Sequence, residues 1–281
     1  HMQGDIYENK DSALCVDNIQ VQNYFEAGIN REFFHKIPSR VFIVGANEIE
    51  TLIDLGAATN IMTAVDHQDD FTWGIKQNNR EFFDQLPFMT AEKVNKENVL
   101  SLHPDLIIAQ QEFFSKNRLE STQFWNKRGI YTMVPLNTTA PGKNNVPETL
   151  EREMQFIYDM GLIFHKEKQA QQIINDTYDR IHLIMEQREG KPRPKVMILD
   201  LISITAAYGP DKIAGNLVQS IGGNVPNTPA AVGDENIIKE NPDIVFLVTY
   251  GDAPERLNRI ANNQAFQNLN FIKNKRLYPI P

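Results

Sequence analysis

The sequence predicts an α/β protein with two similar lobes, because one pattern of residues occurs in each half of the chain. It reads ENVLSLHPDLII from Glu97 and ENIIKENPDIVF from Glu235, so each glutamate stands seven positions before the proline of a Pro-Asp pair. Proline disfavours helical backbone in the residue before it, and continuous apolar runs are typical of strands that are covered on both faces. The pattern therefore predicts a short helix, a stop and a buried strand, once in each lobe.

The first half of the chain alternates predicted strands and helices. A helix over residues 47–55, which ends at Gly56, follows the first strand. Apolar runs predict strands at residues 40–45, 61–65, 106–109 and 130–134. This alternation predicts a doubly wound lobe.

From Pro147 to about Glu189 the pattern is helical, with a break near Gly161. The part after the break carries apolar residues at spacings of three and four, which predicts one amphipathic helix. At a rise of 1.5 Å per residue it would be about 35 Å long, enough to connect two lobes. The alternation then restarts with strands at 196–199 and 244–248 and helices near 213–221 and from Glu235. The expected parts are an arm at 1–37, lobes at 38–164 and 191–281, and a linker helix at 165–190.

Composition limits the classes of partner. The formal charge of −8, from 36 acidic and 28 basic residues, argues against nucleic acid or an anionic membrane surface as the main partner. Cys15 is the single cysteine, which excludes an internal disulfide and a thiolate metal cage. No run of eighteen apolar residues predicts a membrane span. The chain begins His1-Met2-Gln3-Gly4, which is typical of a cloning remnant, and we expect any secretion signal or lipid anchor to have been removed.

Several segments carry a family resemblance. RVFIVGANEIETLIDLGAATNIMTAVD at 40–66, the two Pro-Asp patterns, and ITAAYGPDKIAGNLVQSIGGNVPN at 204–227 resemble the solute-binding proteins of ABC importers for ferric siderophores, haem, cobalamin and some oxyanions. The resemblance implies two Rossmann-like lobes bridged by a single long α-helix, with the ligand cleft between the lobes. It also implies small opening and closing motions.

The resemblance implies a function as well. The chain would be a monomeric, extracytoplasmic substrate-binding component, periplasmic or a cell-surface lipoprotein. It would capture a metal chelate, first a ferric siderophore, otherwise haem or cobalamin, and deliver it to an ABC permease dimer with its ATPase. It would meet the membrane only through the permease or a removed lipid anchor, perform no catalysis and hold no intrinsic cofactor.

The resemblance gives Glu97 and Glu235 a role in docking. In this family one glutamate on each lobe enters an arginine pocket of a permease subunit, and these two match by position. A carboxylate can make bidentate, charge-assisted hydrogen bonds to a guanidinium. The alternative is that each glutamate simply favours the positive end of a helix dipole.

Ligand residues are expected in the loops after the strands, because open α/β sheets bind ligands at the carboxyl ends of their strands. Aromatic and cationic side chains suit an anionic, flat or aromatic chelate. Each candidate also has a structural alternative, such as capping a core or forming a solvated face. The candidates are Asn47, His67, Trp73, Lys76, Arg80 and Gln110 in the first lobe, and Tyr208, Lys212, Tyr250 and Tyr278 in the second.

Direct metal binding is not expected, because no two of the six histidines fall at the spacing that grips zinc, so iron would arrive already chelated. The alternatives are a molybdate or tungstate binder of the same family, a ligand sensor or adaptor, and an enzyme with an interlobe active site. The phosphate-cradling GxxxxGK[ST], the GxGxxG turn and the GxSxG elbow are absent, which makes an enzyme the least favoured.

The two ends of the chain depart from the family pattern. The family usually continues past KNKRLYPIP, so we expect the second lobe to be truncated at Pro281 or to have a short tail. Residues 4–36 match the family poorly. We expect them to form a hairpin or arm on the first lobe, or to cover the cleft.

Overall fold

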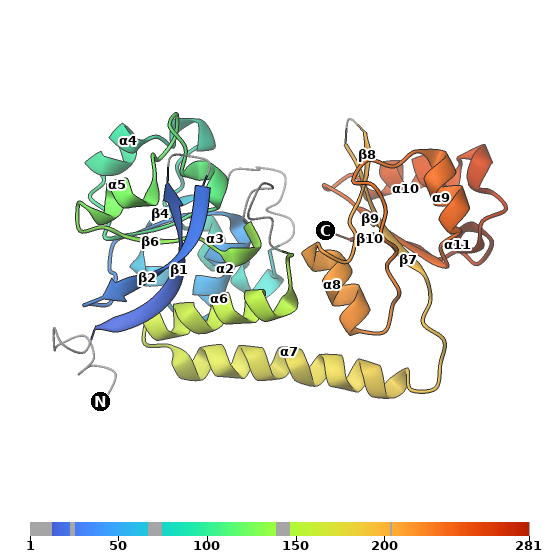
Figure 1. The fold of residues 1–281 in the computed structure, drawn as a ribbon, viewed down its shortest axis with the longest axis horizontal. Helices are drawn as coiled ribbons and strands as arrows, with labels where there is room; N and C mark the ends of the chain where they lie inside the picture. The colour runs from blue at the N-terminus through green and yellow to red at the C-terminus, as the bar shows by residue number, and fades with distance from the viewer. Residues whose placement is uncertain (1–12, 23–25, 67–74, 139–146, 203, 281) are drawn as a thin grey trace. The chain divides into compact units, whose positions relative to one another are not determined.

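The structure, a computed structural model, describes residues 13–22, 26–66, 75–138, 147–202 and 204–280 (Figure 1). The chain folds into two compact units. Unit 1 comprises His1–Val146 and Glu151–Asn175, and unit 2 comprises Pro147–Leu150 and Asp176–Pro281. Each unit is built around its own four-stranded sheet. The α/β fold class predicted from the sequence is confirmed.

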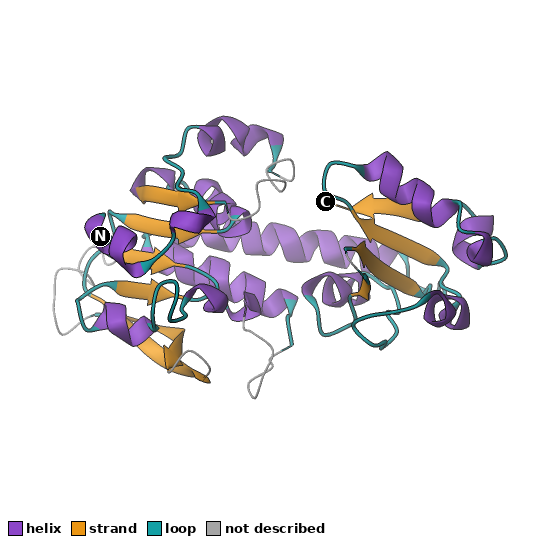
Figure 2. Ribbon diagram, turned by 90° about the horizontal axis from the view of Figure 1, so that it is seen from above, coloured by secondary structure: helices purple, strands orange, loops and turns teal. Residues whose placement is uncertain are grey.

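Unit 1 contains an all-parallel sheet in the order β4-β3-β5-β6. Alternate residues of β3 enter different core clusters, because side chains along a strand point to opposite faces. Val41 and Ile43 pack with one cluster, whereas Phe42 and Val44 pack with the other. Both faces of the sheet are therefore covered (Figure 2). The strands are β3 (Val41–Val44), β4 (Ile61–Val65), β5 (Leu106–Ile108) and β6 (Tyr131–Met133), and the helices are α2 (Ala46–Asp54), α3 (Arg80–Asp84), α4 (Lys96–Ser101), α5 (Thr122–Asn126) and α6 (Leu150–Ile163).

The N-terminal segment forms an antiparallel hairpin of β1 (Leu14–Gln22) and β2 (Glu26–Phe34), in register from Leu14 opposite Phe34 to Gln22 opposite Glu26. Its apolar side chains join the cores of unit 1: Val16 and Phe34 enter one cluster, and Ile19 enters the other. The hairpin is thus an integral layer of unit 1.

The helical region breaks between Ile163 and Glu167, within a few residues of Gly161 and close to the predicted start of the linker helix at residue 165. Gly161 lies inside α6, and the chain turns after it at His165, which has a φ of 56°. A Cβ on Gly161 would overlap the side chain of Ala170 in α7 (Glu167–Gln187). Glycine is therefore present to let the two helices approach closely, and not to end α6. Helix α7 is a single 21-residue helix that begins in unit 1 and ends in unit 2.

Unit 2 contains a mixed sheet in the order β10-β9-β7-β8. Strand β9 runs parallel to β7 and β10, but β8 is antiparallel to β7. The second lobe therefore does not repeat the sheet of the first, although both carry the Pro-Asp pattern. The strands are β7 (Val196–Leu201), β8 (Thr205–Ala207), β9 (Ile244–Val248) and β10 (Leu277–Ile280), and the helices are α8 (Ile213–Ser220), α9 (Asp234–Glu240), α10 (Ala253–Ala261) and α11 (Asn270–Lys273). No helix in the described parts of the chain has the length and apolar character that crossing a membrane requires.

In both units the aspartate of the Pro-Asp pattern binds backbone just before the central strand, and a basic residue there binds the end of the preceding helix. We call this arrangement the Pro-Asp clamp. In unit 1 the Asp105 carboxylate accepts hydrogen bonds from the backbone N–H groups of Ser39 and Arg40, both at 2.9 Å, at the start of β3. The Arg40 side chain in turn donates to the carbonyls of Leu102 and His103, just after α4. The clamp therefore ties the end of a helix to the amino end of the central strand.

In unit 2 the Asp243 carboxylate accepts from the Lys195 N–H at 2.9 Å, just before β7. Lys195 Nζ donates to the carbonyl of Glu240 at 3.1 Å, at the end of α9. The residue before each proline, His103 or Asn241, has a positive φ of 54° or 44°. Both helices thus end in the left-handed conformation, and the stop predicted from the sequence is confirmed.

We expect Asp105→Ala to destabilise the protein by about 2 kcal/mol, because two backbone N–H groups lose their acceptor. The measurement is urea unfolding followed by circular dichroism. Asp84→Ala is the control: Asp84 forms an exposed ion pair with Arg80 at 3.6 Å, and its loss should cost only a few tenths of a kcal/mol. Equal losses in the two variants would show that the clamp contributes nothing.

Candidate functional site

Unit 2 carries a polar cluster at the carboxyl end of its parallel strands. Asp200, near the end of β7, is only 2% exposed. The hydroxyls of Tyr208 and Tyr250, from the loops after β8 and β9, both donate to its Oδ2 atom at 2.6 Å. Its Oδ1 atom is buried and has no hydrogen-bond partner within the described residues. We call these three residues the Asp200 cluster.

The electrostatics of the Asp200 cluster keep both phenols protonated. Burial raises the pKa of Tyr208 and of Tyr250, and the hydrogen bond to Asp200 and its charge raise both further. Arg256 of α10 lies with its guanidinium 4.8 Å from the centroid of the Tyr250 ring. That guanidinium donates to the Asp252 carboxylate at 2.8 and 2.9 Å, and this hydrogen bond lowers the pKa of Asp252. Both tyrosine hydroxyls therefore act as donors to Asp200 at neutral pH.

Unit 1 carries a second buried carboxyl at the corresponding edge. Gly45 follows β3 with a φ of 109°, and a Cβ there would overlap Glu48 Oε2 and Gln110 Nε2. Glu48 is 5% exposed and Gln110 is 9% exposed. Gln110 Nε2 donates to the Val44 carbonyl at 3.3 Å, while its Oε1 atom is buried without a partner in the described part of the chain. Burial, with a smaller contribution from the charge of Glu153, raises the pKa of Glu48 to about 7.

The cationic candidates predicted from the sequence all form ion pairs within their own units. Lys76 Nζ lies 2.6 Å from Asp54 Oδ2, beside the end of α2. Arg80 pairs with Asp84 at 3.6 Å along α3. Lys212, at the start of α8, lies 3.4 Å from the Glu148 carboxylate.

The other candidates are distributed as follows. Asn47 is exposed in the first turn of α2, directly after the carboxyl end of β3. Tyr278 is 44% exposed on β10, with its ring 5.9 Å from that of Phe246. His67 and Trp73 lie outside the described residues. The structure therefore brings Tyr208 and Tyr250 together, and places Gln110 beside Glu48.

Glu97 and Glu235 occupy the same local position. Each is exposed and is the second residue of its helix, α4 or α9. The start of α4 is capped by Asn95, whose side chain accepts from the Asn98 N–H at 2.8 Å. The start of α9 is closed by a hydrogen bond of 2.9 Å from the Gly233 N–H to the Asn236 side chain. The docking role of the two glutamates stays a prediction.

Two residues of these clusters were missed at the sequence level, Glu48 and Asp200. A signal was present for Asp200, because it is the one acid in the apolar run VMILDL that predicts a buried strand. Burying a carboxylate is costly unless it is paired, so an acid in such a run marks a site. Glu48 follows a strand end but looks like an ordinary first-turn acid of a helix.

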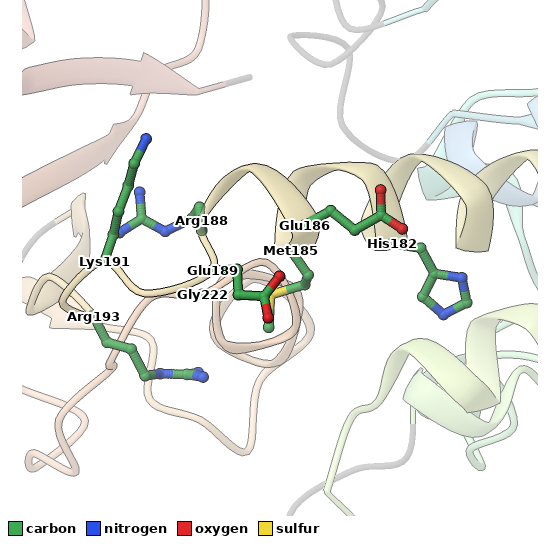
Figure 3. Close-up of a pocket in the computed structure, with 8 residues that line it drawn as sticks. All are labelled: His182, Met185, Glu186, Arg188, Glu189, Lys191, Arg193 and Gly222. Carbon is green, nitrogen blue, oxygen red and sulfur yellow. The ribbon is translucent and has the colours of Figure 1, made fainter.

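A pocket of about 480 Å³ lies elsewhere in unit 2, around the turn after α7 (Figure 3). Figure 3 shows the residues that line it, among them Arg188 and Lys191 at this turn. Arg188 donates to the Pro192 carbonyl, and Arg193 donates to the carbonyls of Gln219 and Gly223. Because the turn precedes the amino end of β7, this pocket is separate from the Asp200 cluster.

Two α/β units that share one long helix, with polar clusters at the carboxyl ends of their strands, are consistent with the fold of two-lobed periplasmic binding proteins. The sequence profile of the periplasmic binding protein family matches residues 41–281. The chain belongs to the periplasmic binding protein family, as the resemblance implied. This is a family of binding proteins and not of enzymes. No curated protein matches the chain.

Solved structures share the fold. A periplasmic binding protein from Veillonella parvula superposes with a TM-score of 0.85 at 23% identity, covering 96% of this chain and 85% of the other. An ABC-type Fe3+-hydroxamate transport system protein from Saccharomonospora viridis gives 0.70 at 16% identity, covering 93% and 90%. The periplasmic haem-binding protein HutB of Vibrio cholerae gives 0.64 at 20% identity, covering 86% and 89%. At these identities the likeness establishes the fold alone.

We expect Glu48→Gln to stabilise the protein at about pH 8 and to change its stability little at about pH 4. Unfolded glutamate loses its proton near its ordinary pKa of 4.5, whereas folded Glu48 holds its proton to about pH 7. The free energy of unfolding of the parent protein therefore falls as the pH rises between these values, and glutamine keeps the shape without titrating. The gain at high pH should be on the order of 2–3 kcal/mol.

The measurement is thermal unfolding of both proteins across this pH range. Glu92→Gln, at an exposed glutamate, is the control and should follow the parent protein at every pH. A constant difference between Glu48→Gln and the parent across the range would contradict the assignment.

Proposed function

We propose that this protein is the extracytoplasmic substrate-binding component of an ABC importer and that its cargo is a metal chelate, first of all a ferric siderophore. The family match over residues 41–281 carries the proposal. The fold it shares with a Fe3+-hydroxamate transport protein and a haem-binding protein supports this class of cargo. The chain would bind its ligand, release it to a permease and leave its chemistry unchanged.

The proposed ligand contacts lie at the carboxyl ends of the strands. Tyr208 and Tyr250 offer aromatic faces and hydroxyl oxygens in unit 2, and Asn47 offers an exposed amide in unit 1. The raised pKa values of both tyrosines disfavour the phenolate that would coordinate a bare metal ion. These phenols therefore suit a metal that arrives with its coordination sites already filled by a chelator.

The proposed contacts with the permease are Glu97 and Glu235. Both carboxylates are exposed at the second position of a short helix, one in each unit. An exposed carboxylate in this position can form a bidentate pair with an arginine of a partner and so orient a transient complex. Two pairs, one on each unit, would fix that orientation better than one.

We expect the purified protein to bind at least one ferric siderophore or haem with a submicromolar dissociation constant. The measurement is isothermal titration calorimetry against ferric hydroxamate and catecholate siderophores, haem, cobalamin, molybdate and tungstate. Tight binding of molybdate alone would replace the chelate by an oxyanion as cargo. A folded protein that is silent across the whole panel would refute the proposed function.

We expect the double variant Glu97→Ala, Glu235→Ala to keep its affinity for the ligand but to lose most uptake. The measurement is uptake of the labelled ligand by cells in which this chain is the only binding protein for the importer. The matched control is Glu81→Ala, Glu255→Ala, which removes one exposed first-turn glutamate from a helix of each unit. Full uptake by the Glu97→Ala, Glu235→Ala variant would show that these glutamates are not needed for docking to the permease.

A further inference from the structure

We infer that the cargo is a neutral or cationic chelate that presents hydrogen-bond donors, and not an anionic chelate or an oxyanion. The inference rests on the proposed function and narrows its ligand class. It follows from three features, each observed within a single unit: the acceptor character of the Asp200 cluster, a buried acceptor of unit 1 that has no partner among the described residues, and the ion pairs formed by the cations that the sequence suggested for an anionic ligand.

The Asp200 cluster is a set of hydrogen-bond acceptors. Both phenol hydrogens are directed at one oxygen of Asp200, at 2.6 Å each. Because the single hydroxyl hydrogen of each tyrosine is used in this way, neither phenol can donate to a ligand, and toward a ligand their oxygens can act only as acceptors. A ligand that offers N–H, O–H or ammonium groups can donate to these oxygens, whereas an anionic oxygen would meet lone pairs and be repelled.

The net charge around the Asp200 cluster is negative, which also disfavours an anionic ligand. Among the described residues no cation forms an ion pair with Asp200, so two neutral hydroxyls are what stabilises its carboxylate. The nearby Arg256 is held by the Asp252 carboxylate, and it also donates to the Leu201 carbonyl. The two aspartates and one arginine leave this edge of unit 2 with an excess of negative charge, which favours cations and disfavours anions.

Unit 1 also carries a buried acceptor at its own edge that has no partner among the described residues. Glu48 is a buried carboxyl at the carboxyl end of β3, and the neighbouring Gln110 has an unpartnered Oε1 atom. A buried acceptor without a donor is costly, and a donor group of a ligand would relieve that cost. Neither residue offers an anion a positive charge.

The cations that the sequence suggested for an anionic ligand are already engaged. Lys76, Arg80 and Lys212 form ion pairs with Asp54, Asp84 and Glu148. An anionic ligand would have to compete with these carboxylates. A ligand without negative charge leaves all of the pairs intact.

The chelating group determines whether a ferric complex is neutral or cationic on the one hand, or anionic on the other. Three hydroxamates neutralise the charge of a ferric ion, and a terminal ammonium then makes the complex cationic. Three catecholates leave a trianionic complex, and molybdate is a dianion. The Asp200 cluster therefore favours a hydroxamate-type chelate with amide or ammonium donors.

The test is calorimetric titration of the full chain with three ferric complexes that share one iron centre. They are the complex of desferrioxamine B, which ends in an ammonium, its N-acetyl derivative, which is neutral, and its N-succinyl derivative, which ends in a carboxylate. A ferric tris-catecholate and molybdate complete the set. We expect the ammonium form to bind at least about tenfold more tightly than the carboxylate form, a gap that narrows as salt is raised.

Variants of the Asp200 cluster test whether this cluster causes the preference for the ammonium form. Asp200→Asn should reduce the preference for the ammonium form severalfold, and Tyr250→Phe should weaken binding of both the ammonium and the acetyl forms. Tyr158→Phe, at an exposed tyrosine of α6, is the matched control and should bind as the parent does. The salt dependence of the unmodified protein tests the charge argument even where a variant fails to fold.

The outcomes separate the inference from the proposed function. Tighter binding of the carboxylate form, of the tris-catecholate or of molybdate would overturn the inference, whereas tight binding of an anionic chelate would leave the importer role in place. Binding of none of the probes by folded protein would count against the proposed function itself, and the inference would fall with it.

Discussion

The fold depends on one contact, the carboxylate of a Pro-Asp pair bound to the backbone at the amino end of a central strand. Asp105 holds the start of β3, and Asp243 holds the start of β7. A basic side chain beside each aspartate then binds the carbonyls at the end of the preceding helix. Because the amino ends of the strands are fixed in this way, their carboxyl ends, where the polar clusters lie, are fixed as well.

The carboxyl end of each sheet carries buried polar groups that lower the stability of the fold. Glu48, in the first turn of α2, and Asp200, near the end of β7, are buried without an ion pair in the described structure. Two buried acceptor atoms there have no partner among the described residues, Oδ1 of Asp200 itself and Oε1 of Gln110 beside Glu48. Burying such groups costs free energy, which the apolar clusters on both faces of the sheet offset. Natural proteins tolerate this cost mainly at sites of function. The two edges of a sheet therefore divide the tasks: the amino edge holds the fold, and the carboxyl edge is left to meet a ligand.

Most of the secondary structure could be predicted from the sequence, because buried strands and amphipathic helices are local patterns. The strands at 61–65 and 244–248 were predicted at their observed bounds. The break in the helical region was predicted within a few residues, but Gly161 itself lies inside α6, where it allows contact with Ala170 and does not end the helix. Strand β8 (Thr205–Ala207) was not predicted, because a three-residue strand leaves little pattern in the sequence, and its antiparallel direction is decided only by its pairing with β7.

The sequence by itself determined the family, the alternation of strands and helices, and the placement of Tyr208 and Tyr250 in loops after strands. Only the tertiary structure decided what these residues do. It showed that both tyrosines donate to Asp200, and that Lys76 and Lys212 are bound by Asp54 and Glu148. The physical reason is that a side chain's hydrogen bonds and charge depend on partners 8, 22, 50 or 64 positions away along the chain. Spacing along the sequence reports the backbone pattern, but the partners become known only when the strands lie side by side.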